Sequence, residues 1–199
     1  MKNILVISLI VIGQVGFSQN SYQSEIEKFQ TNLNEEFKNP EESPLTKKER
    51  KKFKEHNFFP TDETYQVTAD FVKADDPATF QMKTTTNRLP TYDKYGYVKF
   101  SLKGNEYQLT IYQSHTLRET DEYRNYLFLP FTDLTNGEET YGGGRYIDLS
   151  IPDGNQITID FNKAYSPYCA YNYSFSCPIP PAENNMDIRI EAGVKNLKL

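Results

Sequence analysis

Apolar positions along the chain follow two different periods. Behind a short apolar run at the N-terminus, large apolar side chains recur every three or four residues, which is the spacing of one helix face: Tyr22, Ile26, Phe29, Leu33 and Phe37. From Tyr65 onward the period changes to two, the spacing of a strand with one buried face. The pattern therefore predicts an N-terminal helix followed by β structure.

Asn39-Pro40 is expected to end this helix, because the residue before a proline avoids the helical conformation. Thr46 and Glu49 have the spacing of a capping box, which predicts a second, short helix. The segment is strongly basic, with Lys47, Lys48, Arg50, Lys51, Lys52 and Lys54. These residues could contact an anionic partner, but a solvated helix face with Leu45 and Phe53 pointing inward is favoured.

The segment from Tyr97 to Tyr112 predicts a β-hairpin with Gly104 and Asn105 in a two-residue turn. This register places Lys103 opposite Glu106 and makes one face wholly apolar. The facing pairs on that side are Leu102 with Tyr107, Phe100 with Leu109, and Val98 with Ile111.

Arg145 to Ile151 and Gln156 to Phe161 predict a second hairpin. A three-residue loop with Asn155 in the left-handed region pairs Ile151 with Ile157, Leu149 with Ile159, and Ile147 with Phe161. The opposite face then carries Asp148 directly across from Asp160, and Tyr146 beside Asn162.

Two further strands are expected, at Tyr126 to Phe131 and at Met186 to Glu191. About seven strands with the helices confined to the N-terminal end predict a mainly β fold. We expect an antiparallel β-sandwich or a partly open barrel with one or two N-terminal helices. Residues 19–199 are long enough to form one such domain with a sizeable core.

The first residues have the three parts of a secretory signal peptide. Lys2 provides the positive charge, the residues up to Phe17 are mostly apolar, and Gly16 and Ser18 are small. We place the signal peptide at residues 1–18, with cleavage after Gln19 as the alternative. An uncleaved membrane anchor is disfavoured, because a spanning helix needs about 20 apolar residues. The sequence therefore predicts an exported protein, periplasmic or secreted, with no membrane span after cleavage.

The formal net charge of the whole chain is −5, and loss of Lys2 makes it one unit more negative. Because nucleic-acid binding depends on neutralising phosphates, an acidic domain of this kind is not expected to bind nucleic acid. The 15 tyrosines and 13 phenylalanines, with no tryptophan, favour strands and amphipathic surfaces.

The predicted second hairpin brings two carboxylates together, those of Asp148 and Asp160. Like charges directly across a strand pair are destabilising and need a cation, an arginine, a shared proton or water nearby. The pair could serve acid–base chemistry or cation binding. A solvated sheet face, where the repulsion is screened, is the favoured interpretation.

A glycine-rich loop runs from Glu138 through Tyr141 and Gly143 to Arg145. Backbone amides of successive glycines, together with a guanidinium, could bind a carboxylate or a phosphate. A turn or bulge that needs glycine for its backbone angles is favoured instead. By strand parity Arg145 lies on the face of Ile147, so it either caps the core or buries its charge against an acid such as Glu138.

Residues 164–181 form an aromatic, proline-rich loop that contains Tyr168 and both cysteines of the chain, Cys169 and Cys177. In an exported protein a disulfide is the simplest interpretation. Free structural cysteines, or a metal-binding or catalytic cysteine, are the alternatives. His56 and His115 have no spacing that pairs them with these cysteines, so we expect no metal and no cofactor.

Several long and unusual segments resemble an uncharacterised bacterial family, the domain of unknown function DUF1684. They are Phe128 to Tyr146, Asp160-Phe161-Asn162, Tyr168 to Asn172 and Cys177 to Pro181, with further likeness around Ser43-Pro44-Leu45 and Arg88. The resemblance covers nearly all of the chain after the signal peptide. It implies a bacterial source and transfers no activity. The family also includes members that lack an export signal and keep both cysteines, which weakens the disulfide interpretation.

Three functions stay open. The preferred one is an exported domain that binds a small polar or sugar-like ligand, because the candidate residues are close in sequence: Glu138, Tyr141, Gly143, Arg145, Asp148, Asp160, Asn162 and Tyr168. The second is a hydrolytic enzyme that uses Asp148 and Asp160, or Cys169. The third is a structural or assembly protein without a small-molecule site.

Overall fold

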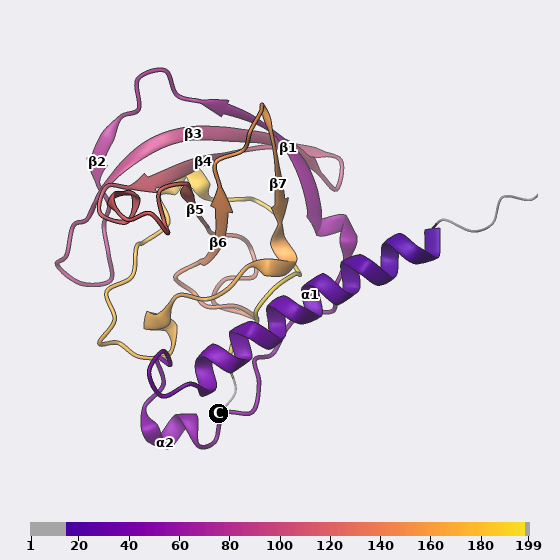
Figure 1. Cartoon of the computed structure of the whole chain (residues 1–199), viewed down its shortest axis with the longest axis vertical. Coiled ribbons are helices and arrows are strands. Elements are labelled where there is room, and N and C mark those ends of the chain that lie inside the picture. Colours follow the sequence, from indigo (N-terminus) through magenta and orange to yellow (C-terminus); the bar gives the residue numbers. More distant parts are fainter. Residues whose placement is uncertain (1–14, 198–199) are drawn as a thin grey trace, which may run out of the picture.

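An antiparallel seven-stranded sheet curls into a half-barrel, and a long helix, α1 (Val15–Lys38), lies alongside it (Figure 1). The computed structural model describes the backbone of residues 15–197 and the side chains of residues 21–197. The expected mainly β fold with a partly open barrel is therefore confirmed. Of the predicted signal peptide, residues 1–14 lie outside the described residues, and the proposed cleavage position after Ser18 falls within α1.

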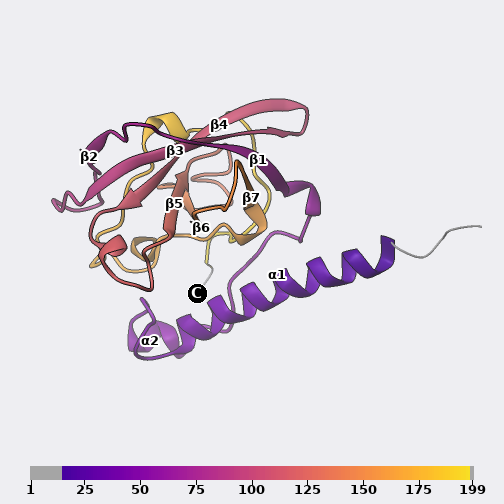
Figure 2. The ribbon, with the colours of Figure 1, turned by 45° about the horizontal axis from the view of Figure 1, so that its top comes forward.

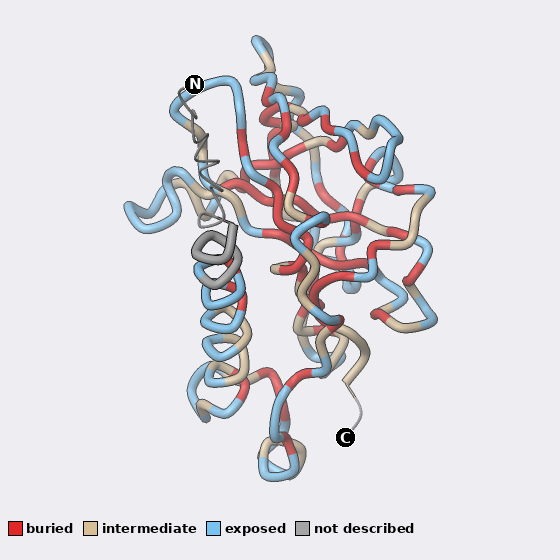
Figure 3. The backbone as a smooth tube through the Cα atoms, turned by 90° about the vertical axis from the view of Figure 1, so that its right-hand side faces the viewer, coloured by how far each residue is buried: buried red, intermediate tan, exposed pale blue. Residues whose placement is uncertain are grey.

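The strand order is β6-β5-β4-β3-β1-β7, and the short β2 also pairs with β3. The strands are β1 (Gln66–Lys73), β2 (Thr79–Gln81), β3 (Thr91–Leu102), β4 (Asn105–Ser114), β5 (Tyr126–Phe131), β6 (Arg145–Ser150) and β7 (Gln156–Asp160). One face of the sheet buries the main core, which includes Val98, Ile111 and Leu129. The other face, across β3 to β6, buries an aromatic cluster that includes Tyr112 and Phe128. The buried positions in Figure 3 follow these strands.

The β3–β4 hairpin forms, but its register differs from the predicted one by two residues. Leu102 faces Asn105 and Phe100 faces Tyr107, so the turn residues are Lys103 and Gly104. Both have positive φ, +49° and +82°, as this type of two-residue turn requires. Lys103 accepts this conformation while its ammonium donates to the Tyr65 hydroxyl at 2.5 Å. Because side chains alternate with a period of two, the slip leaves the same residues on the core face.

The predicted second hairpin is wrong. β6 pairs with β5 and β7 pairs with β1, so Asp148 faces Phe128 and Asp160 faces Gln66. The two ends of the connection between β6 and β7 are bound to different strands. Ile151 donates its backbone N–H to the backbone oxygen of Asn125 beside β5, and the backbone oxygen of Asn155 accepts from the N–H of Phe71 in β1. Asn155 also lacks the positive φ expected of it. Within the described chain β6 and β7 lie at the two ends of the strand order.

The predicted last strand, Met186 to Glu191, is also absent. The segment is irregular, although Met186 and Ile190 are buried in the main core as expected. Just before it, Asn184 inserts its side chain between β4 and β5, where its amide bonds the N–H and C=O of Thr110 and the C=O of Pro130. The end of the chain thus packs on the sheet without extending it.

Helix α1 runs below the sheet (Figure 2) and is joined to the rest of the protein at two places. Near its start, Tyr22 bonds Asp160 at the end of β7. Near its end, Phe37 packs against His56 with ring centroids 4.3 Å apart. The helix ends at Lys38, as Asn39-Pro40 predicts. The short helix α2 (Lys47–Arg50) has the predicted capping box, and Leu45 and Phe53 are buried beside it.

His56 is a buried neutral group at the junction between α1 and the rest of the protein. Its backbone N–H and its Nδ1 lie 2.7 and 2.9 Å from the side-chain oxygen of Asn34 on α1. Its Nε2 has no hydrogen-bond partner among the described residues. Burial among aromatic rings lowers the pKa of His56 to about 4.

Replacing Gly104 with alanine should destabilise the protein by about 1 kcal/mol, because an L-residue is strained at a φ of +82°. A Cβ at Gly104 meets no atom within 4 Å, so the cost is conformational alone. Gly154 is the matched control, since it has equal space and no positive φ, and Gly154→Ala should cost nothing comparable. Urea unfolding measures both, and equal effects would contradict the assigned turn.

Stability should fall on acidification through His56. The unfolded histidine takes a proton near pH 6.5, whereas the folded one does so only near pH 4, so protons favour the unfolded chain between these values. The loss should reach about 3 kcal/mol at pH 4. In His56→Phe the backbone bond to Asn34 is kept and this contribution vanishes. Unfolding free energies of both proteins at pH 7 and 4.5 test this, and parallel pH profiles would refute it.

Candidate functional site

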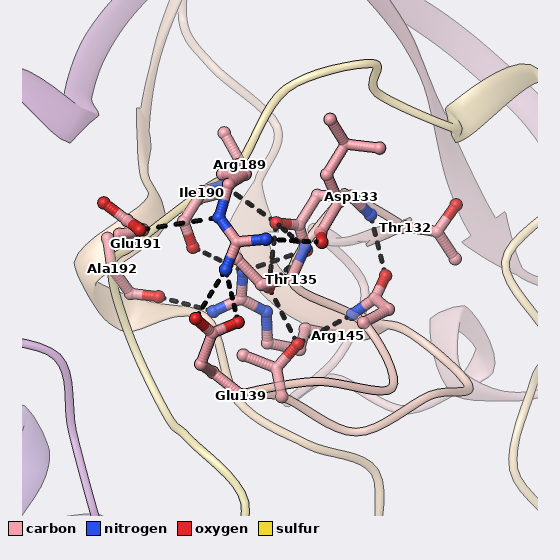
Figure 4. A network of polar contacts seen from close by, with 12 residues as sticks. Thr132, Asp133, Thr135, Glu139, Arg145, Arg189, Ile190, Glu191 and Ala192 are labelled. Carbon is pink, nitrogen blue, oxygen red and sulfur yellow. Dashed lines mark hydrogen bonds and ion pairs between the residues drawn. The ribbon is translucent and has the colours of Figure 1, made fainter.

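The guanidinium of Arg145, at the start of β6, is fully buried and binds protein groups only (Figure 4). It lies 3.1 Å from the carboxylate of Asp133, whose side chain is also fully buried. It donates to the backbone oxygens of Ile190, at 2.8 Å, and Ala192. Asp133 in turn accepts from the hydroxyl of Thr135 and from the N–H of Ile190. Of the two alternatives expected for Arg145, the structure has the buried charge, and the acid that pairs with it is Asp133.

The glycine loop has a structural role at two positions. Gly144 has a φ of +91°, and a Cβ there would lie 2.6 Å from the backbone oxygen of Phe131. A Cβ at Gly143 would collide with the ring of Tyr141. Glu138 is exposed and binds Arg189 at 2.9 Å, so it is not the partner of Arg145. At these two positions glycine is needed for the backbone angle and the packing of the loop, which agrees with the favoured turn or bulge.

Asp160 and Asn162 fasten helix α1 to the sheet. Asp160 is buried and accepts from the hydroxyl of Tyr22, from the side chain of Gln66 and from Asn162. Asn162 also donates to Tyr22 and to the backbone of Asp62. These donors occupy both oxygens of Asp160. Asp160 and Asp148 line one hollow of about 340 Å³ between the sheet edges, but they do not form the predicted cross-strand pair.

The two cysteines are free and buried, so the predicted disulfide is wrong. The backbone N–H of Cys169 donates to the sulfur of Cys177 at 3.1 Å, and the hydroxyl of Tyr141 lies 3.8 Å from the sulfur of Cys169. The hydrogen bond between the two cysteine side chains lowers the pKa of the Cys169 thiol and raises the pKa of the Cys177 thiol. Burial raises the pKa of Tyr141 to about 12. The pair packs as a structural element of the aromatic loop.

A pocket of about 530 Å³ opens between α1 and the β6 edge, and we call it the α1–β6 pocket. The helix contributes one wall, with Phe29, Asn32, Leu33, Glu36 and Phe37. The sheet and the aromatic loop contribute the opposite wall, with Tyr123, Tyr146, Asp148, Tyr165, Tyr168 and Phe175 among its residues. Its size is that of a small-molecule site. Two of the predicted ligand-binding residues, Asp148 and Tyr168, line it together with Cys177.

Asp148 is held in a fixed orientation in this pocket. The hydroxyls of Tyr126 and Tyr165 both donate to its Oδ1, each at 2.7 Å. No hydrogen bond from another described residue reaches Oδ2. The side chain is open to water within the pocket but has protein on most sides. This partial desolvation raises the pKa of Asp148, while the two phenolic hydrogen bonds oppose the shift.

A second carboxylate, that of Glu36 on α1, lines the same pocket. The hydroxyl of Tyr168 donates to its Oε1. Burial raises the pKa of Glu36, and the charge of Asp148 adds to this shift, whereas the bond from Tyr168 opposes it. The pocket thus contains two acidic groups held by tyrosines.

A family profile described as "Protein of unknown function (DUF1684)" matches residues 51–195. The chain belongs to this family. It is also similar to the solution structure of an uncharacterised protein of Haloarcula marismortui, with 32% identity and a TM-score of 0.69 over 89% of this chain and 96% of that one. The DUF1684 resemblance read from the sequence is therefore confirmed. No curated protein matches the chain.

Within the DUF1684 segment, sequence reasoning missed the two tyrosines that hold Asp148, namely Tyr165, which lines the pocket, and Tyr126, which lies behind it. One signal was available for Tyr126, because β5 is apolar at every position and such a strand is covered on both faces. Glu36, outside that segment, is also a pocket residue, and the available signal was its position three residues after Leu33 of the apolar stripe. The contact between Tyr165 and Asp148 depends on the path of the chain in three dimensions, which no local sequence pattern predicts.

Within residues 15–197, no set of three or more acidic, histidine or cysteine side chains is arranged to hold a metal ion. No helix in the same part of the chain has the length and apolar character needed to cross a membrane. The imidazole of His115 pairs with the carboxylate of Asp93, at 2.8 Å.

Replacing Arg145 with methionine should cost about 3–5 kcal/mol, because it leaves the Asp133 carboxylate buried without a cation. The matched control is Arg189→Met, since Arg189 makes ion pairs with Glu138 and Glu139 at the surface and should matter far less. Urea unfolding compares the two variants. Similar losses would show that the buried pair is not an organising contact of the family fold.

Proposed function

We propose that the protein binds a small molecule with a polar group in the α1–β6 pocket. The observation that carries the proposal is Asp148, whose Oδ1 is held by two tyrosines while its Oδ2 has no partner among the described residues. A fixed, partly desolvated acceptor in a largely aromatic pocket is typical of a group that orients a ligand. With the predicted export signal, the binding would take place outside the cytoplasm.

The geometry gives less support to a hydrolytic role. Asp160, one of the expected acidic pair, is occupied by donors that fasten α1. Cys169 is buried with 2% of its surface exposed and is not among the residues that line the pocket. Neither group is placed to act on a molecule beside Asp148. Binding is therefore the preferred proposal.

A thermal-shift screen of sugars, amines and carboxylic acids tests the proposal, because a ligand at about 100 times its Kd stabilises the fold by about 2.7 kcal/mol. Asn32→Trp should abolish the shift by filling the pocket from the exposed helix side. Ser24→Trp, at an exposed position of α1 outside the pocket, should leave it intact. The proposal fails if no compound raises Tm, or if Asn32→Trp responds like wild type.

A further inference from the structure

The α1–β6 pocket presents hydrogen-bond acceptors and few free donors. The hydroxyl proton of Tyr165 is directed to Asp148, that of Tyr168 to Glu36, and that of Tyr146 to the backbone oxygen of Pro178. A phenol that already donates can only accept from a ligand. The carboxylate oxygens of Asp148 and Glu36 are acceptors as well.

The charges of the pocket also favour a ligand that donates hydrogen bonds and carries a positive charge. Asp148 and Glu36 come from opposite walls, and no lysine, arginine or histidine is among the described residues that line the pocket. A ligand carboxylate or phosphate would therefore meet two negative groups without a cation to offset them. A neutral polyol would find acceptors for its hydroxyls but few donors.

The aromatic rings favour a cation in addition. Phe29 on the helix and Tyr123, Tyr146 and Phe175 on the other wall line the pocket. The negative face of an aromatic ring attracts a cation, and more strongly where water is partly excluded. The same rings can pack against an apolar body.

From these features we infer that the ligand is an organic cation bearing N–H donors, a primary ammonium or a guanidinium on an apolar body that fits about 530 Å³. Its N–H groups bond Asp148 Oδ2 and the Glu36 carboxylate, and the rings enclose the rest. The inference depends on the proposed binding function and specifies its ligand class.

Three compounds of nearly equal size test it by calorimetry: 2-phenylethylamine, the neutral 2-phenylethanol and the anionic 3-phenylpropanoate. The amine should bind wild type at least about tenfold more tightly than either of the others. Asp148→Asn and Glu36→Gln keep an oxygen for the tyrosines and remove the charge, so each should weaken the amine about tenfold or more and weaken the alcohol much less. Asn32→Trp should abolish binding.

Each other outcome has a defined meaning. The cation inference is wrong, and the binding function stands, if the alcohol or the carboxylate binds as tightly as the amine. The same holds if amines do not bind but other ligands do, and Asn32→Trp abolishes the binding of those ligands. If no compound of any class binds, both are wrong. Should one carboxylate variant fail to fold, the other decides, because each removes one of the two charges.

Discussion

The buried ion pair of Arg145 and Asp133 is the interaction on which the C-terminal part of the fold depends. Residues 186–192 have no neighbouring strand, yet the backbone groups of Ile190 and Ala192 need partners once they are buried. The guanidinium and the carboxylate provide those partners. A buried ion pair adds little net stability by itself, because desolvation offsets the attraction. Here it holds Ile190 and Ala192, which lie beyond the backbone hydrogen bonds that join Met186 and Ile188 to Thr132 and Leu134.

The second constraint is the open edge of the sheet. A curled sheet that stops before its edges join leaves β6 and β7 unpaired with each other, and exposed edges invite association. Helix α1 covers this region, held by Tyr22 on Asp160 near one end and by Phe37 on His56 near the other. A helix cannot fill the space beside an edge as a strand would. The α1–β6 pocket is the space that is left.

Local patterns predicted the elements well, and they failed where partners are distant in sequence. The helix over Tyr22 to Phe37 and the strand Tyr126–Phe131 followed from spacing alone. The β3–β4 register slipped by two residues because Lys103 takes a conformation that is usually left to glycine. The hairpin of β6 and β7 was expected because the strands are adjacent in sequence, yet β6 pairs with β5 and β7 with β1. Of the site, only Asp148 and Tyr168 were predicted, since the pocket joins residues over a hundred positions apart.

The position of α1 has a consequence for what family membership means. The DUF1684 profile begins at residue 51, whereas Phe29, Asn32, Leu33, Glu36 and Phe37 form one wall of the pocket. The matched segment therefore covers the sheet, the buried arginine and one wall of the pocket, but not the helix that forms the other wall. A different helix at this place would keep the sheet and change the shape and charge of the pocket. Under the proposed binding function, the helix therefore contributes to the choice of ligand as much as the sheet does.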